Sequence, residues 1–478
     1  MRIHQRSIDM KRKPYLLPVI AVLFLCGCTM APQYTRPDAP VPSEWPKGAA
    51  YAEIKIGTSE QSASELPWTE FITDERLHKN IETALNNNRD LRVAALNVEK
   101  MKAMYGIGVA SLLPTVNALG SLSKAGVPAD LSQSGSASTT ERYDASIGIT
   151  SWELDFFGRI QSLKDKALEE FMATDQARLS TKIMLISSVT QAYLAVAANR
   201  EALQLVSKTL ESQEAGYKLI QKRYDVGMIS ELDLRRAQSQ VDVARGDVAN
   251  YTQLTAQSEN ALNLLVASPV PQDLMPADLS SVSSPREISA GLSSELLLNR
   301  PDILAAEYQL KAAYANIGAA RANFFPRVIL TGAAGTASVE LSGLFKPGSF
   351  AWSFAPQIIM PIFDARTWFA YRVTKIDREI AVAQYEKSIQ TAFREVADAL
   401  AVKGTVDRQI SAQQSLVDAL SVAYRLTLAR YDKGIDSYLS VLDAQRSLYS
   451  AQKGLIALHF ARFNNAVTLY KALGGGYK

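Results

Sequence analysis

Residues 223–238 read "RYDVGMISELDLRRAQ", and residues 430–445 read "RYDKGIDSYLSVLDAQ". Both stretches carry Arg-Tyr-Asp-x-Gly, a Ser seven positions after the Arg, and a closing Ala-Gln. The similarity continues upstream, where "NNRDLRVAA" at 87–95 matches "NRPDILAAE" at 299–307. Self-similarity at a fixed separation indicates that the chain contains two copies of one structural unit.

Proline spacing predicts what this unit contains. The chain has 19 prolines, but none lies between Pro128 and Pro269 and none after Pro361. A proline inside a helix costs about 3 kcal/mol, so long spans without one favour helices. The sequence predicts two long helices over 159–222 and 366–429, a length typical of coiled coils.

Each predicted long helix ends at an RYDxG motif, whose Gly can adopt the left-handed conformation that closes a helix. Return helices are then expected over about 230–266 and 437–472. Two shorter pieces, about 74–111 and 294–323, would complete their length by stacking end to end on them. The repeated stretch is therefore predicted to be the tip of a helical hairpin.

The segments between the shorter helices and the long ones have a different hydrophobic period. In "YDASIGIT" (143–150) and "FAWSFA" (350–355), apolar residues alternate with small or polar ones. Period two with one apolar face predicts strands. The Gly-rich segments near 115–123 and 327–339 are weaker candidates for two more strands, so each chain is expected to contribute four.

Four strands cannot close a membrane barrel, which begins at about eight strands, so several chains would have to contribute. Tyr143, Trp152, Phe350 and Trp352 are candidates for aromatic residues at the membrane interface. The alternative is a small soluble sheet packed on the helices, in which these aromatic residues serve simple packing.

The N-terminus has the order of an export signal, with basic residues followed by the apolar run "YLLPVIAVLFL". The run is too short for a permanent membrane span. Leu25-Cys26-Gly27-Cys28 resembles a bacterial lipobox, which predicts that residues 1–27 are removed and that Cys28 carries lipid. Thr29 after the cysteine favours the outer membrane. An ordinary secretory signal with incidental cysteines is the alternative.

Charge and histidine content argue against several function classes. Without residues 1–27 the chain has 46 basic and 47 acidic residues, which disfavours nucleic-acid binding. His4, His78 and His459 are scattered, and neither a P-loop nor a dinucleotide fingerprint occurs. The sequence therefore predicts no enzyme, no metal site and no cofactor.

Taken together, the lipobox, the doubled unit, "WELDFFGR", "LLNRPDI", "RYDxGxxS" and "LYKALGGG" resemble the TolC family of outer-membrane efflux channels, in the lipoprotein branch typified by OprM. The resemblance implies an α plus transmembrane β fold, in which a homotrimer forms a twelve-stranded barrel continued by a coiled-coil periplasmic tunnel. It also implies a passive exit duct for drugs or other small toxic compounds. Its partners would be a periplasmic adaptor (membrane fusion) protein and an inner-membrane resistance-nodulation-division pump. A type I protein secretion duct is the alternative.

Domain boundaries follow from the repeats and this resemblance. Residues 29–70, 267–293 and the C-terminal end would form an irregular belt. The expected segments are 1–27 (signal peptide), 28–73 (lipid-anchored segment and linker), 74–266 (first repeat), 267–293 (equatorial linker) and 294–478 (second repeat and C-terminal segment).

The resemblance also implies roles for residues near the hairpin tips. Leu439 and Asp443 are the candidates for a periplasmic gate, with Arg235 or Arg236 on a neighbouring hairpin attracting the acid. Coiled-coil packing and a solvated surface charge are the alternatives. The residues expected to face the adaptor are Gly227, Ser230, Gly434 and Ser437, although a turn needs glycine for its own sake.

Overall fold

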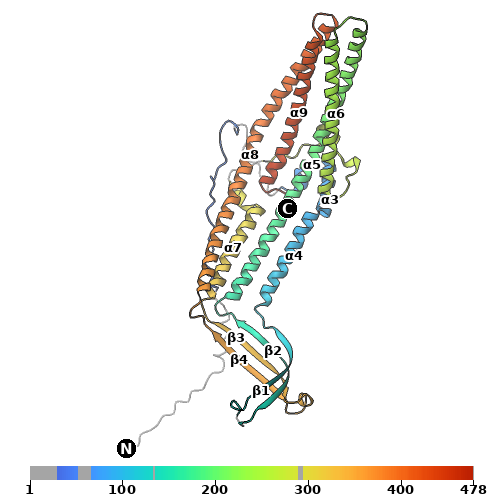
Figure 1. Ribbon diagram of the computed structural model, residues 1–478. Coiled ribbons are helices and arrows are strands. Elements are labelled where there is room, and N and C mark those ends of the chain that lie inside the picture. Colours follow the sequence, from blue (N-terminus) through green and yellow to red (C-terminus); the bar gives the residue numbers. More distant parts are fainter. Residues whose placement is uncertain (1–28, 52–65, 133–134, 289–293, 477–478) are drawn as a thin grey trace, which may run out of the picture. The chain divides into compact units, whose positions relative to one another are not determined.

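The computed structural model describes residues 29–51, 66–132, 135–288 and 294–476, so Cys28 and the signal peptide lie outside the described residues. The chain divides into two compact units (Figure 1). The sheet unit comprises Met1–Pro37, Glu99–Ala173 and Glu307–Ala383, and the tip unit comprises Asp38–Val98, Thr174–Ala306 and Gln384–Lys478.

Two very long helices dominate the chain, as predicted. They are α5 (Arg159–Asp225) and α8 (Ala365–Asp432), and each continues three residues beyond its predicted end. The return helices are α6 (Glu231–Val266) and α9 (Tyr438–Ala472), and Figure 1 shows each pair as a hairpin. Among the described residues, α5 has the one stretch apolar enough to cross a membrane, but 56% of that stretch is buried inside the protein, as in a core helix.

The first short helix differs from the prediction of one helix over 74–111. It is two helices, α3 (Glu75–Asn87) and α4 (Arg89–Ala110), separated at Asn88. Asn88 has an extended backbone, and its side chain accepts hydrogen bonds from the backbone N–H groups of Asp90 and Leu91. Asparagine favours such a capping position over a helix interior, which is why the helix breaks there.

The second short helix also starts later than the predicted position 294. A 3-10 turn, η3 (Ser294–Asn299), precedes α7 (Pro301–Ala322). Proline is favoured at the first position of an α-helix because its missing N–H would be unpaired there anyway. Pro301 therefore marks the true start.

The four predicted strands are confirmed, and they form one antiparallel sheet in the order β1-β2-β3-β4. Their bounds are β1 (Val116–Val127), β2 (Ser138–Leu154), β3 (Arg327–Ser338) and β4 (Phe350–Ile359). The short turn η4 (Leu341–Gly343) lies between β3 and β4. Strands β1 and β4 are the two edges, and each has one side without a partner strand in this chain.

The register places most of the large apolar residues of the four strands on one face, although Leu119, Ile329 and Ile359 lie on the other. Trp352 pairs with Ala334, which pairs with Ile147, and paired residues point to the same side. The apolar face carries Val116, Ala118, Leu122, Tyr143, Ala145, Ile147, Ile149, Phe350, Trp352 and Phe354. The opposite face carries Asn117, Ser121, Asp144, Ser146, Gly148, Ala333, Gly335 and Ser353.

Strands β2 and β3 approach each other closely on this small-residue face. A Cβ added at Gly148 would lie 2.3 Å from the carbonyl oxygen of Gly332, and one added at Gly335 would lie 2.1 Å from that of Ala145. Glycines at such positions allow a sheet to bend. The small-residue face is therefore the concave one.

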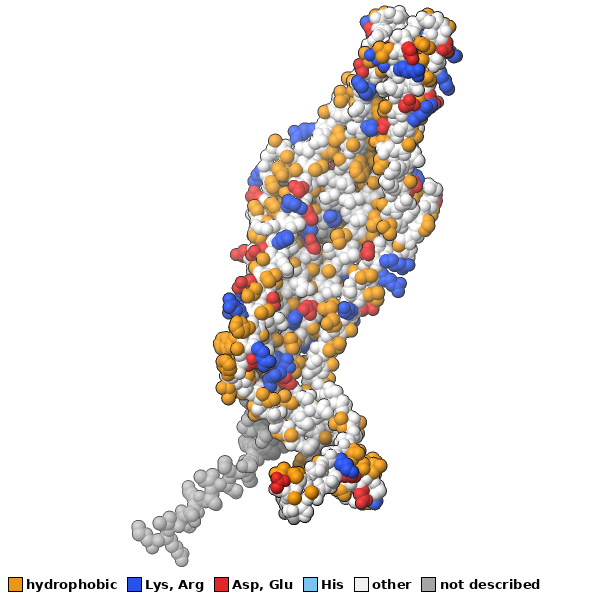
Figure 2. Space-filling model, in the orientation of Figure 1, with side chains coloured by type: hydrophobic (Ala, Val, Ile, Leu, Met, Phe, Trp, Pro, Cys, Tyr) orange, Lys and Arg blue, Asp and Glu red, His pale blue; other side chains and the backbone are white. Residues whose placement is uncertain are grey.

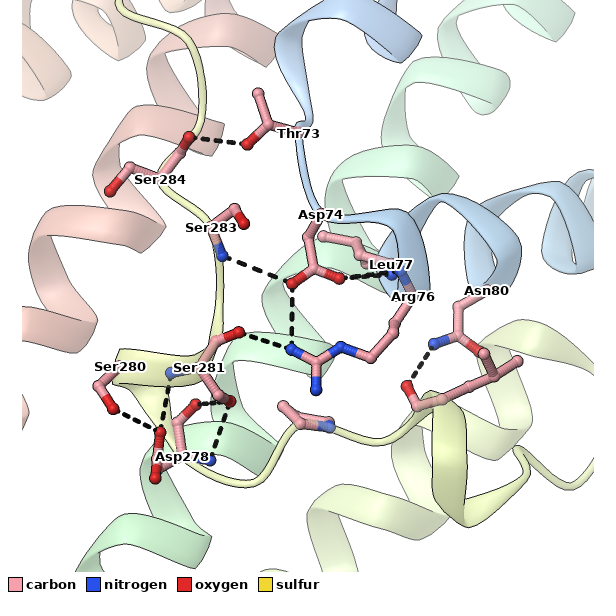
Figure 3. A network of polar contacts seen from close by, with 12 residues as sticks. Thr73, Asp74, Arg76, Leu77, Asn80, Asp278, Ser280, Ser281, Ser283 and Ser284 are labelled. Carbon is pink, nitrogen blue, oxygen red and sulfur yellow. Dashed lines mark hydrogen bonds and ion pairs between the residues drawn. The ribbon is translucent and has the colours of Figure 1, made fainter.

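In the tip unit, the segment after α6 is fastened to the start of α3 (Figure 3). Asp74 caps α3, and Arg76 Nη2 donates to the carbonyl oxygen of Ser281 at 2.6 Å. Figure 3 shows the surrounding bonds, from Thr73 to Ser284, from Ser283 to Asp74, from Asn80 to Leu274 and from Ser280 to Asp278.

The described parts of segments 29–73 and 267–293, where the belt was expected, contain only short elements. They are α2 (Trp68–Phe71), η1 (Gln272–Leu274) and η2 (Leu279–Ser281). Residues 29–37 belong to the sheet unit, apart from the other described belt segments, and the described residues after α9, 473–476, are not helical.

Candidate functional site

Both hairpin tips close with the same backbone geometry. Gly227 and Gly434 have φ angles of +75° and +71°, in the left-handed region that favours glycine. At the first tip, Gly227 N–H donates to Tyr224 and Met228 N–H donates to Arg223, each at 2.8 Å. The second tip repeats this pair of bonds from Gly434 to Tyr431 and from Ile435 to Arg430, each at 2.9 Å. This pair of hydrogen bonds is the Schellman arrangement. The prediction that the glycine of RYDxG closes the helix is therefore confirmed.

A serine begins each return helix. Ser230 Oγ accepts a hydrogen bond from Asp233 N–H at 3.3 Å, whereas Ser437 makes no such bond and lies 3.4 Å from Ser440 Oγ. Ser230, Ser437 and the two turn glycines are all exposed. Their contact with an adaptor stays a prediction.

The candidate gate residues lie on exposed helix faces near the second tip. Leu439 is 40% exposed, and Asp443, one turn further along α9, is also exposed. The equivalent positions in α6 are Leu232, which is 58% exposed, and Arg236. A constriction formed by several chains needs side chains that each chain leaves uncovered, and these residues meet that condition.

Every charged candidate has a partner on its own helix. Asp443 accepts a hydrogen bond from Arg446 Nη2 at 2.8 Å. Arg235 lies 3.2 Å from Glu231, and Arg236 lies 3.8 Å from Asp233. Exposed pairs of this kind contribute only about 0–1 kcal/mol, so they are easily exchanged for other partners. The predicted attraction of Asp443 to an arginine of a neighbouring hairpin stays a prediction.

A cluster of tyrosines near the tips was missed at the sequence level. The buried residues Ile220, Leu234 and Ala237 of the first hairpin pack with Tyr431 and Tyr438 of the second. The two tyrosine rings are 5.2 Å apart, and burial raises the pKa of Tyr438 to about 12. The repeated motif contains a tyrosine in each copy, but only the fold shows that Tyr431 is the one that joins the hairpins.

In the sheet unit, the four predicted interface aromatics occupy two levels of the sheet. Phe350 and Trp352 are 71% and 72% exposed near one end, and Tyr143 pairs with Ser338 at the same end. Trp152 pairs with Leu330, eight positions along β3 from Ser338, or roughly 26 Å away. A register shift between Ile149 and Trp152 keeps both on the apolar face.

The segment 29–37, here called the strap, was predicted to be part of the belt but contacts α7. Tyr34 Oη and Arg36 Nη2 donate to the buried carboxylate of Glu307 at 3.0 and 2.5 Å, and Lys311 lies 3.2 Å from it. Burial alone would raise the pKa of Glu307, but these donors outweigh burial and lower it. The strap is therefore held by a paired buried charge.

The sheet unit also exposes apolar helix faces. No residue of α4 is buried, and Met104 and Ile107 are 45% and 68% exposed. On α8, exposed apolar side chains recur at helical spacing at Phe369, Val373, Ile376 and Ile380. Exposed apolar faces of this extent mark contact surfaces.

These features match one protein family. The family described as "Outer membrane efflux protein" matches residues 80–268 and 292–475. The chain belongs to this family.

Relatives of this efflux protein extend over almost its whole length. The toluene efflux pump outer membrane protein TtgF of Pseudomonas putida is 46% identical over 472 residues, which cover 97% of each chain. The probable outer membrane lipoprotein SilC of Salmonella typhimurium is 36% identical and covers 97% of this chain and 98% of its own. The open state of the MtrE outer membrane channel of Neisseria gonorrhoeae is similar in structure, with a TM-score of 0.84, 38% identity, and coverage of 94% of this chain and 99% of that one.

The efflux protein thus has the fold of outer-membrane channels of the TolC-like family. Its family consists of transporters. In the described part of the chain, no group of three or more His, Cys, Asp or Glu residues is arranged to hold a metal ion.

Proposed function

We propose that three copies of this chain close a twelve-stranded barrel, and that the barrel is the outer-membrane exit of a tripartite efflux pump. The observation that carries the proposal is the four-stranded sheet with two open edges and one apolar face. In a membrane every backbone N–H and C=O must be paired, so β1 and β4 need partner strands from other chains. Strand β4 of one copy would pair with β1 of the next.

The helices agree with this closure. Helix α4 leads into β1 and β4 leads into α8, so joining the two sheet edges also brings α8 of one copy beside α4 of the next. These are the helices that expose apolar faces in the sheet unit. The apolar sheet face would then meet lipid, while the concave small-residue face would line the pore.

The duct needs no chemistry of its own. An inner-membrane pump would supply the energy, and a periplasmic adaptor would connect the pump to the hairpin tips at Gly227, Ser230, Gly434 and Ser437. The cargo we propose is small apolar compounds such as toluene and other solvents, because relatives are named toluene, solvent and antibiotic efflux proteins. Passive conduction also agrees with membership in a transporter family rather than an enzyme family.

The gate would lie at Leu439 and Asp443. Three copies of each around one axis would give a ring of apolar side chains one helical turn from a ring of carboxylates, and carboxylate rings select cations. Arg235 and Arg236 on neighbouring hairpins would compete with Arg446 for Asp443. Such marginal pairing suits a gate that opens when an adaptor docks.

The remaining assignments concern the chain's segments. Cys28 would carry the lipid, and Cys28→Ser should abolish fatty-acid labelling while the barrel still inserts. Residues 74–266 and 294–478 would be the two repeats, in agreement with the two separate matches to the family at 80–268 and 292–475.

The proposal is tested by native mass spectrometry of the detergent-purified full chain and by toluene tolerance of a host that lacks its own duct. The expected result is three subunits and restored tolerance. Ile376→Asp combined with Ile380→Asp should lower the trimer fraction and tolerance together, whereas Glu379→Lys, which lies off the apolar face of α8, should lower neither. A stable monomer that conducts ions across a lipid bilayer would refute the closure.

A further inference from the structure

An open groove of about 610 Å³ lies beside the strap in the sheet unit. Its lining comes from three segments, namely the start of the strap, the end of α7 and the start of α8. The lining residues are Thr29, Met30, Ala31, Arg321, Phe324, Phe325, Trp368 and Tyr371. It is called the strap groove below.

One wall of the strap groove is aromatic. The ring of Phe324 meets Trp368 edge-on with centroids 5.0 Å apart, and it meets Tyr371 in the same way at 5.9 Å. Trp368 nevertheless remains 66% exposed. Exposed indole and phenyl groups are typical of the boundary between lipid chains and headgroups.

Two cations complete the groove. Arg321 donates from Nε to Tyr371 Oη and from Nη1 to the Met30 carbonyl oxygen, both at 3.2 Å. Lys375 Nζ lies 5.1 Å from the centre of the Tyr371 ring. Among the described residues, neither Arg321 nor Lys375 has a carboxylate partner within 4.0 Å. Arginine has five N–H donors, so Arg321 retains donors for an anion.

The pKa of Tyr371 reflects the positive charges around the groove. The hydrogen bond from Arg321 lowers its pKa, and the nearby charges of Lys375 and Arg378 act in the same direction, while burial opposes them. Arg378 lies 3.6 Å from the neighbouring Glu379 and is therefore partly neutralised. The uncompensated charge belongs to Arg321 and Lys375.

The aromatic and cationic groups follow one another in the order of a phospholipid. Along the chain, Phe324 is three residues closer to β3 than Arg321, and Trp368 is seven residues, about two helical turns, closer to β4 than Lys375. A helical turn rises about 5.4 Å. Because the sheet is proposed to lie in the membrane, the aromatic wall is on the membrane side of the two cations.

The groove is also next to the proposed lipid anchor. The strap that lines it begins at Thr29, the residue directly after the proposed lipid-bearing Cys28. Figure 2 shows hydrophobic side chains gathered over the sheet-proximal parts of α7 and α8, with basic side chains beside them.

We propose that the strap groove binds one anionic phospholipid of the periplasmic leaflet, with its acyl chains against Phe324 and Trp368 and its phosphate between Arg321 and Lys375. The bound lipid would share Arg321 with the Met30 carbonyl oxygen and so tie the strap to the leaflet. This site goes beyond conduction, and it rests on the proposed insertion of the sheet in the outer membrane.

The test measures lipid binding to the full chain in detergent by native mass spectrometry, with phosphatidylglycerol and phosphatidylethanolamine as probes. The unmodified chain should retain one phosphatidylglycerol per chain in preference to phosphatidylethanolamine. Arg321→Gln combined with Lys375→Gln should weaken phosphatidylglycerol binding by about thirtyfold, since each of the two basic residues contributes about 1 kcal/mol near a membrane surface and about 1.4 kcal/mol corresponds to tenfold. Phosphatidylethanolamine binding should not change.

A charge-matched control removes two cations from the same helix end, outside the groove, by Arg366→Gln and Arg372→Gln. This control should bind phosphatidylglycerol normally, and equal weakening in both double variants would overturn the site. Glycerophosphoglycerol, the headgroup without acyl chains, should not displace the lipid, and effective displacement would show a phosphate site instead. Repeating the binding on Cys28→Ser separates the two proposals, because the groove should still bind when labelling at Cys28 is lost.

Discussion

At the first hairpin tip, Ile229 packs against the buried cluster of Ile220, Leu234 and Ala237. At the second tip the equivalent residue is Asp436, which accepts two hydrogen bonds from Arg430, at 2.7 Å from Nε and 3.0 Å from Nη2. The turn between the helices has the same hydrogen bonds in both copies. The same backbone is therefore stabilised by apolar burial in one copy and by an ion pair in the other.

The arginine of the repeated motif shows the same division of roles. Arg223 in the first copy lies 5.0 Å from the centre of the Tyr431 ring, which belongs to the other hairpin, whereas Arg430 in the second copy pairs within its own turn. The motif arginine thus contributes to the joint between hairpins in the first copy, and it stabilises an exposed turn in the second. Acidic and basic side chains lie close together at these tips (Figure 2). A tip stabilised by exposed ion pairs is the easier one to rearrange, which suits the copy that carries Asp443.

The largest difference between the tips is expected from Leu234→Ala. Leu234 is only 5% exposed, and a buried Leu→Ala change costs about 2–5 kcal/mol. Hydrogen exchange of the amides in residues 220–240 should accelerate accordingly. The control Leu232→Ala, at an exposed position on the same helix, should change exchange little, and equal effects of the two variants would contradict an apolar joint at the first tip.

The turn glycines should show where the two tips are alike. Gly227→Ala and Gly434→Ala each place a Cβ on a left-handed residue, which costs about 1–2 kcal/mol. Both changes should destabilise their own tip to the same extent, measured again by amide exchange. Gly246→Ala is the matched control in a helix interior with open space around it, and it should stabilise α6 by up to about 1 kcal/mol. Clearly unequal costs at Gly227 and Gly434 would show that the two turns differ.

Variants of the gate residues compare the two tips in channel opening. Leu439→Ala combined with Asp443→Ala should raise the ratio of open to closed channels by about fivefold, the effect of losing one exposed pair. Leu232→Ala combined with Arg236→Ala, the equivalent change in the first copy, should have a smaller effect. Single-channel recordings of folded oligomers measure both, and an unchanged ratio and cation selectivity in the first double variant would place the constriction elsewhere.

Lowering the pH should destabilise only the second tip. This is the smallest of the four predicted effects. Hydrogen bonds from Arg430 lower the pKa of Asp436 below its ordinary value of 3.8. The ion pair therefore contributes fully above pH 3.8 and is lost as the pH falls through the lowered pKa. Amide exchange at residues 430–440, corrected for the intrinsic rate, should rise over this range, and Asp436→Asn should remove the pH dependence. A similar rise at residues 223–233 would contradict the assignment to Asp436.

Sequence reasoning succeeded where a single residue type decides the local conformation. The positive φ angles of Gly227 and Gly434 follow from the RYDxG motif, and the long helices α5 and α8 follow from the absence of proline. It failed at Asn88 and Pro301, although both residues carry the signal for a helix start. The predicted helices ran through them because they were inferred from the length needed beside the long helices, which does not show where a capping side chain will be used.

The paired side chains at the candidate sites were out of reach for a different reason. Glu307 with Arg36, and Trp368 with Arg321, are separated by many residues along the chain, so no local pattern joins them. Tyr224 and Tyr431 occupy the same place in their motifs, yet only Tyr431 packs in the joint between hairpins.

By itself, the sequence determined the doubled unit, the helical hairpins, the four strands with one apolar face and the candidate lipid cysteine, because each depends on residues close together in the chain. Tertiary structure alone decided the register of the sheet, its concave face, the anchoring of the strap at Glu307 and the cations left without acids beside the aromatic wall. Burial and charge pairing depend on which segments, distant in the sequence, contact one another. Those contacts are stabilised by packing between the segments, which no short stretch of sequence contains.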